Sequence, residues 1–151
     1  MNVENKNTLG WQEWVALPKV GLSALLAKTD TGAAPSALHA FNIQPFGPDS
    51  NPKVRFGINP INENKSFAIY CSANVTDMRE ITSSNGISEI RYVIKTPLKI
   101  GDSDLKDIEV TLTNRENMRY RMILGRSALE VFYLKVKNLN HSIHLLRFKK
   151  S

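Results

Sequence analysis

The chain has 151 residues, which is enough for one domain with one hydrophobic core. Its 42% hydrophobic and 23% charged residues are typical of a globular protein, and no apolar run approaches the roughly 20 residues that span a bilayer. The basic residues behind the formal charge of +6 are dispersed and lack interleaved stacking aromatics, so we expect neither membrane insertion nor nucleic-acid binding.

The N-terminal residues 1–8 are polar, and we expect them to form a disordered tail before a single domain over residues 9–151. They lack the apolar segment of a signal peptide, and with the single cysteine, Cys71, this predicts a cytoplasmic protein. A periplasmic protein whose signal peptide had been removed would show the same sequence. Cys71 can form no disulfide within the chain, and its alternating apolar neighbours predict a buried, unreactive thiol.

Short segments with strand-like patterns follow one another along the chain. The segments expected to form strands are residues 13–20, 22–29, 37–40, 53–60, 67–75, 78–82, 87–96, 108–113, 121–124, 131–136 and 142–148. Residues 45–53 are rich in proline and other turn residues, which predicts a surface loop. Residues 127–132 fit a short helix with Ser127 as its N-cap. Many short strands separated by turns predict a closed all-β fold.

The strongest hairpin turn is Ser83-Ser84-Asn85-Gly86, because Asn-Gly tolerates positive φ at both positions. A hairpin can close over a cleft and add backbone hydrogen bonds to an extended peptide. Ser83, Ser84, Asn85 and Gly86 are therefore candidates for a flap, and an ordinary β-hairpin is the alternative.

The segment around Asp30 carries the clearest functional pattern. An apolar run over residues 22–27 leads into Asp30-Thr31-Gly32-Ala33, and a second short apolar run follows. This pattern predicts a strand, a tight loop with a carboxylate at its tip, and another strand. Gly32 lets the backbone turn sharply, and the Thr31 hydroxyl can bond backbone groups of the loop. The structural alternative for Asp30 is an Asx-turn residue that only caps the loop.

Five blocks of the chain resemble one protein family. They are Gly10-Trp11-x-Glu13-Trp14-Val15-x-Leu17-Pro18, Ala27-Lys28-x-Asp30-Thr31-Gly32-Ala33-x-x-Ser36-Ala37-Leu38-His39-Ala40, Arg91-Tyr92-Val93-Ile94-x-Thr96, Thr111-Leu112-Thr113-Asn114-Arg115-x-x-Met118 and Ile123-Leu124-Gly125-Arg126. Together they resemble the retropepsin-like aspartic proteases, in the bacterial branch labelled "ATP-dependent zinc protease". The resemblance implies a retropepsin-like closed β-barrel with Asp30 as the catalytic residue and Thr31, Gly32 and Ala33 in the active-site loop. It also implies that residues 123–126 pack under this loop.

Aspartic-protease chemistry needs two close carboxylates that share one proton, as is general for these enzymes. One oxygen activates a water molecule while the other carboxyl polarises the peptide carbonyl. The chain holds one Asp-Thr-Gly, so a complete site needs Asp30 from two chains, which predicts a homodimer. The predicted function is an aspartic endopeptidase that needs no cofactor and acts on peptides or proteins, with acidic substrates favoured by the charge of +6.

Three arginines in the matching blocks, Arg91, Arg115 and Arg126, are candidates to bind an acidic side chain or to hold loops by paired hydrogen bonds. For Arg126 the structural role is preferred.

Two other functions stay open. The resembling branch is often encoded beside an ATP-grasp ligase that adds glutamate to proteins, so a catalytically silent peptide-binding or regulatory module linked to such a ligase is one alternative. The other is a zinc-dependent peptidase, as the family label says. The sequence has no His-Glu-x-x-His motif, and His141 and His144 would lie on opposite faces of a strand, so we assign no metal ligands. We expect His39 to be a hydrogen-bonded structural residue.

Overall fold

The computed structural model describes residues 8–61, 66–82, 85–115, 119–130, 133–139 and 142–147, and side chains between residues 9 and 130. The strands are β1 (Thr8–Leu9), β2 (Gln12–Leu17), β3 (Leu22–Thr29), β4 (Ser36–His39), β5 (Phe41–Phe46), β6 (Lys53–Ile58), β7 (Ile69–Asn74), β8 (Asp77–Thr82), β9 (Ser88–Ile100), β10 (Ser103–Thr113), β11 (Met122–Leu124), β12 (Tyr133–Leu139) and β13 (Ser142–Arg147). A 3-10 turn, η2 (Pro18–Val20), and a short helix, α1 (Arg126–Leu129), lie between them.

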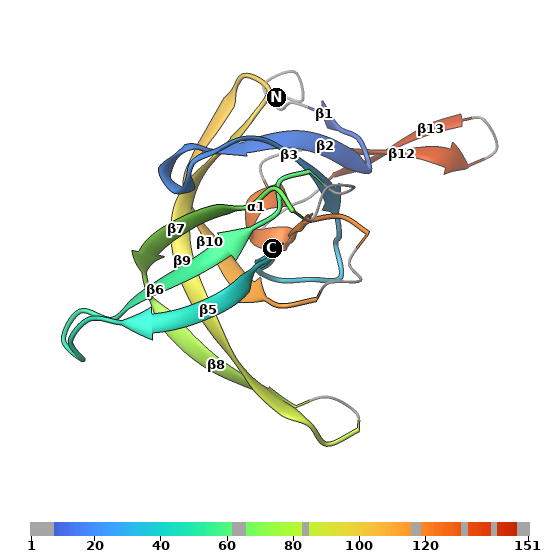
Figure 1. Ribbon diagram of the computed structural model, residues 1–151. Coiled ribbons are helices and arrows are strands. Elements are labelled where there is room, and N and C mark those ends of the chain that lie inside the picture. The colour runs from blue at the N-terminus through green and yellow to red at the C-terminus, as the bar shows by residue number, and fades with distance from the viewer. Residues whose placement is uncertain are drawn as a thin grey trace.

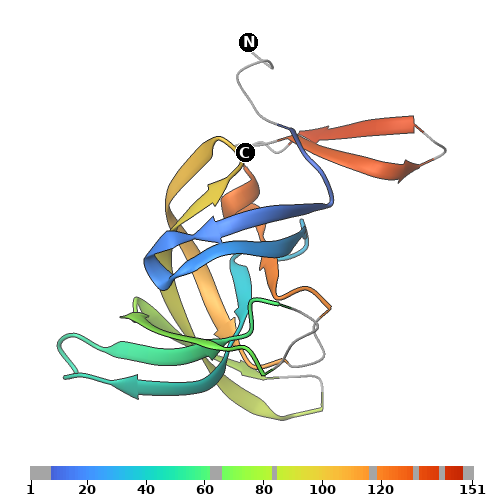
Figure 2. The ribbon, with the colours of Figure 1, turned by 45° about the horizontal axis from the view of Figure 1, so that its top comes forward.

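Six strands close into a barrel (Figures 1 and 2). Their hydrogen-bonded order is β10-β4-β11-β3-β2-β9, and β9 also pairs with β10, which closes the ring. Most neighbours are antiparallel, but β4 runs parallel to β10 and β11 runs parallel to β3. β8 pairs with β9 and continues outside the ring. The predicted all-β, retropepsin-like closed barrel is confirmed.

The core fills the barrel with side chains from alternate strand positions. Leu25 and Ala27 of β3 are fully buried, while Ala24 before them is exposed and Leu26 between them is half-buried. Leu38 of β4 and Leu124 of β11 meet them inside. A shift of one residue would turn these buried side chains to solvent, so the pattern fixes the register of β3 and the place where the chain leaves it at Asp30.

A second antiparallel sheet, β5-β6-β7, packs against the barrel. Val54, Phe56 and Ile58 of its central strand are fully buried in the same core. Gly57 is required there, because an added Cβ would lie 2.7 Å from the Phe41 ring. The sheet therefore belongs to the body of the domain.

Two predicted boundaries are wrong at prolines. Pro45 and Phe46 belong to β5, so the predicted loop over residues 45–53 is shorter. β5 is an edge strand, and an edge tolerates the missing N–H of proline. The first predicted strand ends at Leu17 instead of residue 20, because Pro18 opens a 3-10 turn.

Two further expectations, for Thr8 and for the start of α1, need correction. Thr8, predicted to lie in the tail, pairs with Tyr133 in a small sheet of order β1-β12-β13. The N-cap of α1 is Gly125 instead of Ser127, with no side-chain cap. Predictions for residues 1–7, 131–132, 140–141 and 148–151 lie outside the described residues. No helix in the described part of the chain is long and apolar enough to cross a membrane.

Candidate active site

Asp30 lies at the tip of the loop that follows β3. Its backbone N–H donates to the carbonyl of Leu124 (2.9 Å), and its carboxylate Oδ1 accepts the N–H of Gly32 (2.8 Å). The N–H of Ala33 donates to the carbonyl of Asp30 (3.3 Å), which closes the turn. Asp30 is half-buried, so the backbone fixes a residue that keeps contact with solvent.

The segment after β11 supports this loop from below. The N–H groups of Arg126 and Ser127 donate to the carbonyls of Ala33 (2.7 Å) and Ala34 (3.0 Å), which takes the place of a side-chain cap on α1. Gly125 is required by close approach, because an added Cβ would lie 2.3 Å from the carbonyl oxygen of Pro35. Residues 123–126 thus pack under the loop, as the resemblance implies.

Two side chains tie the loop to its support. The Nη1 of Arg126 donates to the carbonyl of Thr31 (2.9 Å), which gives Arg126 a structural contact. The Oγ of Ser36 accepts the buried N–H of Gly125 (3.1 Å), and the carbonyl of Ser36 accepts the Thr111 hydroxyl (3.2 Å). The loop is therefore held by β4, β10, β11 and α1 together.

A second set of contacts lies at the end of β3, beside Asp30. The carbonyl of Trp11 accepts both the N–H (2.9 Å) and the hydroxyl (3.1 Å) of Thr29. The Trp11 ring packs edge-on against Tyr120, with centroids 6.2 Å apart, and the Tyr120 hydroxyl donates to Gln12 Oε1 (2.7 Å). Tyr120 thereby joins the segment between β10 and β11 to the strand next to the Asp30 loop.

The other two candidate arginines occupy different places. The backbone N–H of Arg115 donates to Nδ1 of His39 (3.1 Å), and the residue is exposed. Arg91 lies on β9, and its Nη2 donates to Oε1 of Glu89 (3.2 Å) within the same strand. Arg115 is therefore joined to the strand that leaves the Asp30 loop, whereas Arg91 belongs to the β8-β9 hairpin.

The β8-β9 hairpin extends beyond the barrel (Figure 1). Its last described pair is Thr82 with Ser88, and Ser83 and Ser84 lie outside the described residues. Gly86 has a φ of 84°, the left-handed conformation that the predicted turn needs at this position. Large apolar side chains are exposed along the hairpin: Met78, Ile81, Ile87 and Ile90. Such side chains indicate a surface that contacts another molecule.

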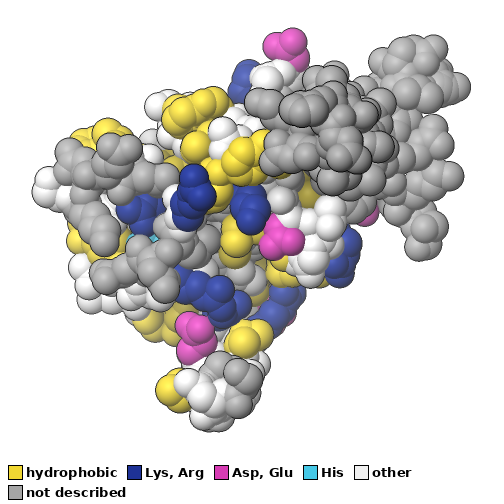
Figure 3. All heavy atoms as spheres, turned by 90° about the vertical axis from the view of Figure 1, so that its right-hand side faces the viewer, with side chains coloured by type: hydrophobic (Ala, Val, Ile, Leu, Met, Phe, Trp, Pro, Cys, Tyr) yellow, Lys and Arg dark blue, Asp and Glu magenta, His cyan; other side chains and the backbone are white. Residues whose placement is uncertain are grey.

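Four exposed basic side chains come from β3, from α1 and from the segment between β10 and β11. Lys28 on β3, Arg115 and Arg119 between β10 and β11, and Arg126 on α1 are all exposed. Figure 3 shows Lys and Arg side chains on one face of the molecule, with Asp or Glu side chains among them.

No group of three or more His, Cys, Asp or Glu residues that could hold a metal ion occurs among the described residues. Cys71 lies on β7 and its thiol donates to the carbonyl of Phe56 (4.0 Å). Burial raises the pKa of the Cys71 thiol to about 11, so it is protonated and unreactive at neutral pH. His141 and the side chain of His144 lie outside the described residues.

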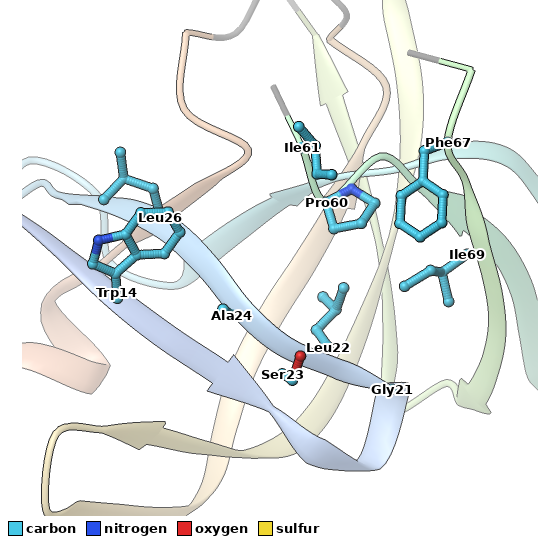
Figure 4. A pocket seen from close by; sticks show the side chains of 10 residues that line it. All are labelled: Trp14, Gly21, Leu22, Ser23, Ala24, Leu26, Pro60, Ile61, Phe67 and Ile69. Carbon is cyan, nitrogen blue, oxygen red and sulfur yellow. The ribbon is translucent and has the colours of Figure 1, made fainter. Parts of the chain in front are cut away.

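One hollow of the described surface is lined by no residue of the Asp30 loop. It has a volume of about 650 Å³ and lies between the β2-β3 hairpin and the loop that joins β6 to β7 (Figure 4). Its wall is mostly apolar and includes Trp14, Leu26, Ile61 and Phe67.

The sequence predicts no role for three residues that build the site: Ser36, Tyr120 and Arg121. Ser36 stands in the matching block around Asp30, which is a signal that it serves the loop. Arg121 is only 3% exposed, and its carbonyl accepts the N–H of His39 (2.8 Å). The predicted strand over residues 121–124 includes this buried arginine and leaves out its exposed neighbour Arg119.

A closed six-stranded barrel with an Asp-Thr-Gly loop over a Leu-Gly-Arg segment defines a retropepsin-like protein. Residues 8–143 match the RimB-like family, described as retropepsin-like aspartic endopeptidase RimB. The chain belongs to this family.

The chain is also similar to longer proteins with another name and to one solved structure. A protein of Shewanella pealeana named probable alpha-L-glutamate ligase is 44% identical over 126 residues, which cover 83% of this chain and 27% of that protein. A protein of the same name from Desulfotalea psychrophila is 42% identical over 124 residues, covering 82% and 26%. The chain thus spans about a quarter of these relatives. The crystal structure of Lpg0085 from Legionella pneumophila, a protein of unknown function, has a TM-score of 0.66 and 30% identity, covering 86% of this chain and 92% of that one.

Proposed function

We propose that the protein is an aspartic endopeptidase that is active as a homodimer, with Asp30 of each chain as one half of the catalytic pair. The observation that carries the proposal is the Asp30 loop, whose carboxylate accepts the N–H of Gly32 while residues 124–126 hold the backbone beneath it. The family match supports the same chemistry.

In the proposed mechanism the two Asp30 carboxyls share one proton, because close like charges do not both ionise. The ionised carboxylate takes a proton from a water molecule as the oxygen attacks the peptide carbonyl. The protonated carboxyl donates its proton to the carbonyl oxygen. The C–N bond of the tetrahedral intermediate then breaks as the leaving nitrogen takes the proton of the pair. One hydroxyl of the intermediate returns a proton to the pair as the carboxylic acid forms, so the pair again shares one proton.

The other aspartates on the described chain do not supply a second carboxylate within this loop. Asp49 lies in the turn between β5 and β6, and Asp102 lies in the turn between β9 and β10. Asp77 accepts hydrogen bonds from Arg79 (2.9 Å) and from the N–H of Met78 (2.8 Å) at the base of the hairpin. A second chain is the natural source of the missing carboxylate, and the edge strands β1 and β13 offer backbone groups that can pair with it.

The proposed substrate is a peptide with acidic side chains, bound in extended form beneath the β8-β9 hairpin. The exposed basic residues Lys28, Arg115, Arg119 and Arg126 favour this class. Arg carboxylate pairs are strong when bidentate and partly desolvated. Added salt weakens such attraction, since the screening length is about 8 Å at 0.15 M, so the preference for acidic peptides is expected to shrink as salt rises.

A second function is supported by the relatives named probable alpha-L-glutamate ligase, of which this chain spans about a quarter. In this alternative the domain binds acidic peptides without cutting them and serves an ATP-grasp ligase as a regulatory partner. It would keep the dimer and the cleft but show no turnover.

The experiment that separates these functions measures hydrolysis and binding of a fluorescent glutamate-rich peptide by the wild-type protein and Asp30→Asn. The peptidase proposal predicts turnover by the wild type, loss of turnover in Asp30→Asn and retained binding. Binding without turnover by the wild type supports the silent module. A chelator series tests the zinc-dependent alternative, which predicts inhibition that added zinc reverses.

A further inference from the structure

His39 contacts both ends of the segment that joins β10 to β11. Its ring is buried at 1% exposure, and Nδ1 accepts the backbone N–H of Arg115 (3.1 Å). Its own backbone N–H donates to the carbonyl of Arg121 (2.8 Å). One residue of β4 therefore fixes the start and the end of a segment that is far from it in sequence.

The hydrogen bond to Arg115 defines the state of the ring. An Nδ1 atom that accepts an amide N–H carries no proton, so His39 is neutral with its proton on Nε2. The chemistry proposed for Asp30 uses no imidazole. His39 contributes a hydrogen-bond acceptor, its Nδ1 atom, which is held in one position. A buried apolar side chain of similar size has no acceptor.

The described residues of this segment, 114–115 and 119–121, are called the wall here, and Tyr120 joins them to the strand that leads into Asp30. Tyr120 packs against Trp11, and its hydroxyl donates to Gln12 (2.7 Å). The carbonyl of Trp11 in turn accepts the N–H of Thr29, the residue before Asp30. The guanidinium of Arg119 lies over the Tyr120 ring at 5.9 Å from its centroid. A shift of this segment would therefore disturb groups that are joined, through Tyr120 and Trp11, to the end of the strand that leads into Asp30.

We propose that His39 is a positioning residue for substrate binding, which holds the wall that carries Arg115, Arg119 and Tyr120 without touching the substrate. This inference rests on the proposed peptidase function of Asp30. The wall acts mainly on binding, whereas Asp30 acts on the bond that breaks, so the two residues have different kinetic signatures.

The test compares His39→Leu with His39→Asn. Leucine has similar branching but no acceptor, whereas the Oδ1 of asparagine is attached to Cγ like the Nδ1 of histidine and can accept the Arg115 N–H. We expect His39→Leu to raise KM for a glutamate-rich peptide about tenfold, the effect of losing one hydrogen bond, with a smaller change in kcat. His39→Asn should stay within about threefold of the wild type.

Asn59→Leu is the matched control for a general loss of stability. Asn59 is buried at 6% exposure, and its Nδ2 donates to the carbonyl of Phe67 (3.0 Å), at the end of β6. This variant should lose stability without a rise in KM. A rise equal to that of His39→Leu would assign the effect to stability and overturn the positioning role.

Hydrogen exchange of the Arg115 amide gives a readout that needs no turnover. We expect protection in the wild type and in His39→Asn and fast exchange in His39→Leu. If the Arg115 amide stays protected in His39→Leu, or if KM is unchanged, the inference is wrong. If His39→Leu does not fold, His39→Gln replaces it, because its acceptor lies one atom further out and should not restore the bond. An inactive wild type with the expected exchange pattern would refute the peptidase proposal but keep the role of His39 in holding the wall.

Discussion

Arg126 and Thr31 are joined by a 2.9 Å hydrogen bond from the guanidinium Nη1 to the carbonyl oxygen, across 95 positions of sequence. The same arginine donates its backbone N–H to Ala33 (2.7 Å), so it contacts the Asp30 loop twice. The backbone bond survives any substitution except proline, whereas the guanidinium bond can be removed alone. A substitution of the Arg126 side chain therefore tests how strongly peptidase activity depends on the position of the Asp30 loop.

We predict that Arg126→Met lowers kcat/KM about tenfold, because the carbonyl of Thr31 loses its donor and the loop gains freedom. Stability should fall by no more than about 1 kcal/mol, since the residue is exposed. Peptide hydrolysis and thermal unfolding measure the two effects. Arg55→Met is the control, because Arg55 lies over the Tyr70 ring in the second sheet, at 4.8 Å. Equal losses of activity in both variants would show that Arg126 has no specific role.

Gly125→Ala is expected to destabilise the protein by about 1–3 kcal/mol and to reduce activity, because the added Cβ would lie 2.3 Å from the Pro35 carbonyl oxygen. That oxygen belongs to the backbone of the loop, so the loop must move. Gly10→Ala is the matched control, since its Cβ would meet its nearest atom at 3.4 Å. Chemical denaturation of both variants measures the difference. A Gly125→Ala protein as stable and as active as Gly10→Ala would contradict the described packing.

The sequence predicts the part of the site that lies within one segment. β3 is a continuous apolar strand, and its predicted bounds, residues 22–29, match the structure. The Asp-Thr-Gly-Ala loop follows directly, so its position was accessible from local pattern and family resemblance. The same resemblance placed residues 123–126 beneath the loop, although nothing in the local composition of that segment indicates this contact.

The parts that sequence does not reveal depend on distant or unusual contacts. The hydrogen bond between Gly125 and Ser36 spans 89 positions, and that between Arg115 and His39 spans 76. No periodicity encodes such pairs. β5 escaped prediction because it is a partly polar edge strand that contains Pro45, and an edge places few demands on side chains.

Replacing Asn85-Gly86 with Pro-Pro is expected to lower peptidase activity at least about tenfold, equivalent to roughly 1.4 kcal/mol. Proline fixes φ near −65°, whereas Gly86 has a φ of 84°, so the hairpin tip must rearrange. The control is Asp49→Ala with Ser50→Ala in the turn between β5 and β6. Hydrolysis of the same peptide is measured for both proteins. Full activity in the Pro-Pro variant would remove the flap assignment.

Cys71 is expected to resist alkylation in the folded protein. Burial raises its pKa from 9.0 to about 11, so at pH 8 its thiolate fraction is about 100-fold smaller than in an unfolded chain. In the unfolded chain the Cys71 thiol has the lower pKa, so it loses its proton at a lower pH than in the folded protein. The contribution of Cys71 to the free energy of unfolding is therefore present below pH 9 and declines as pH rises from about 9 to 11. Iodoacetamide labelling followed by mass spectrometry, with and without denaturant, measures the difference. Equal labelling rates in the folded and in the denatured protein would contradict the expected resistance to alkylation.

The central claim is that two chains share one catalytic pair. Chains with different affinity tags, one wild type and one Asp30→Asn, are produced together, and mixed dimers are isolated by two affinity steps, with sedimentation confirming their size. A shared pair predicts that a mixed dimer, with one Asp30 carboxylate, is inactive, and that an equal mixture of freely exchanging chains retains about a quarter of wild-type activity. Mixed dimers with half of the wild-type activity would show that each chain works alone and would contradict the account.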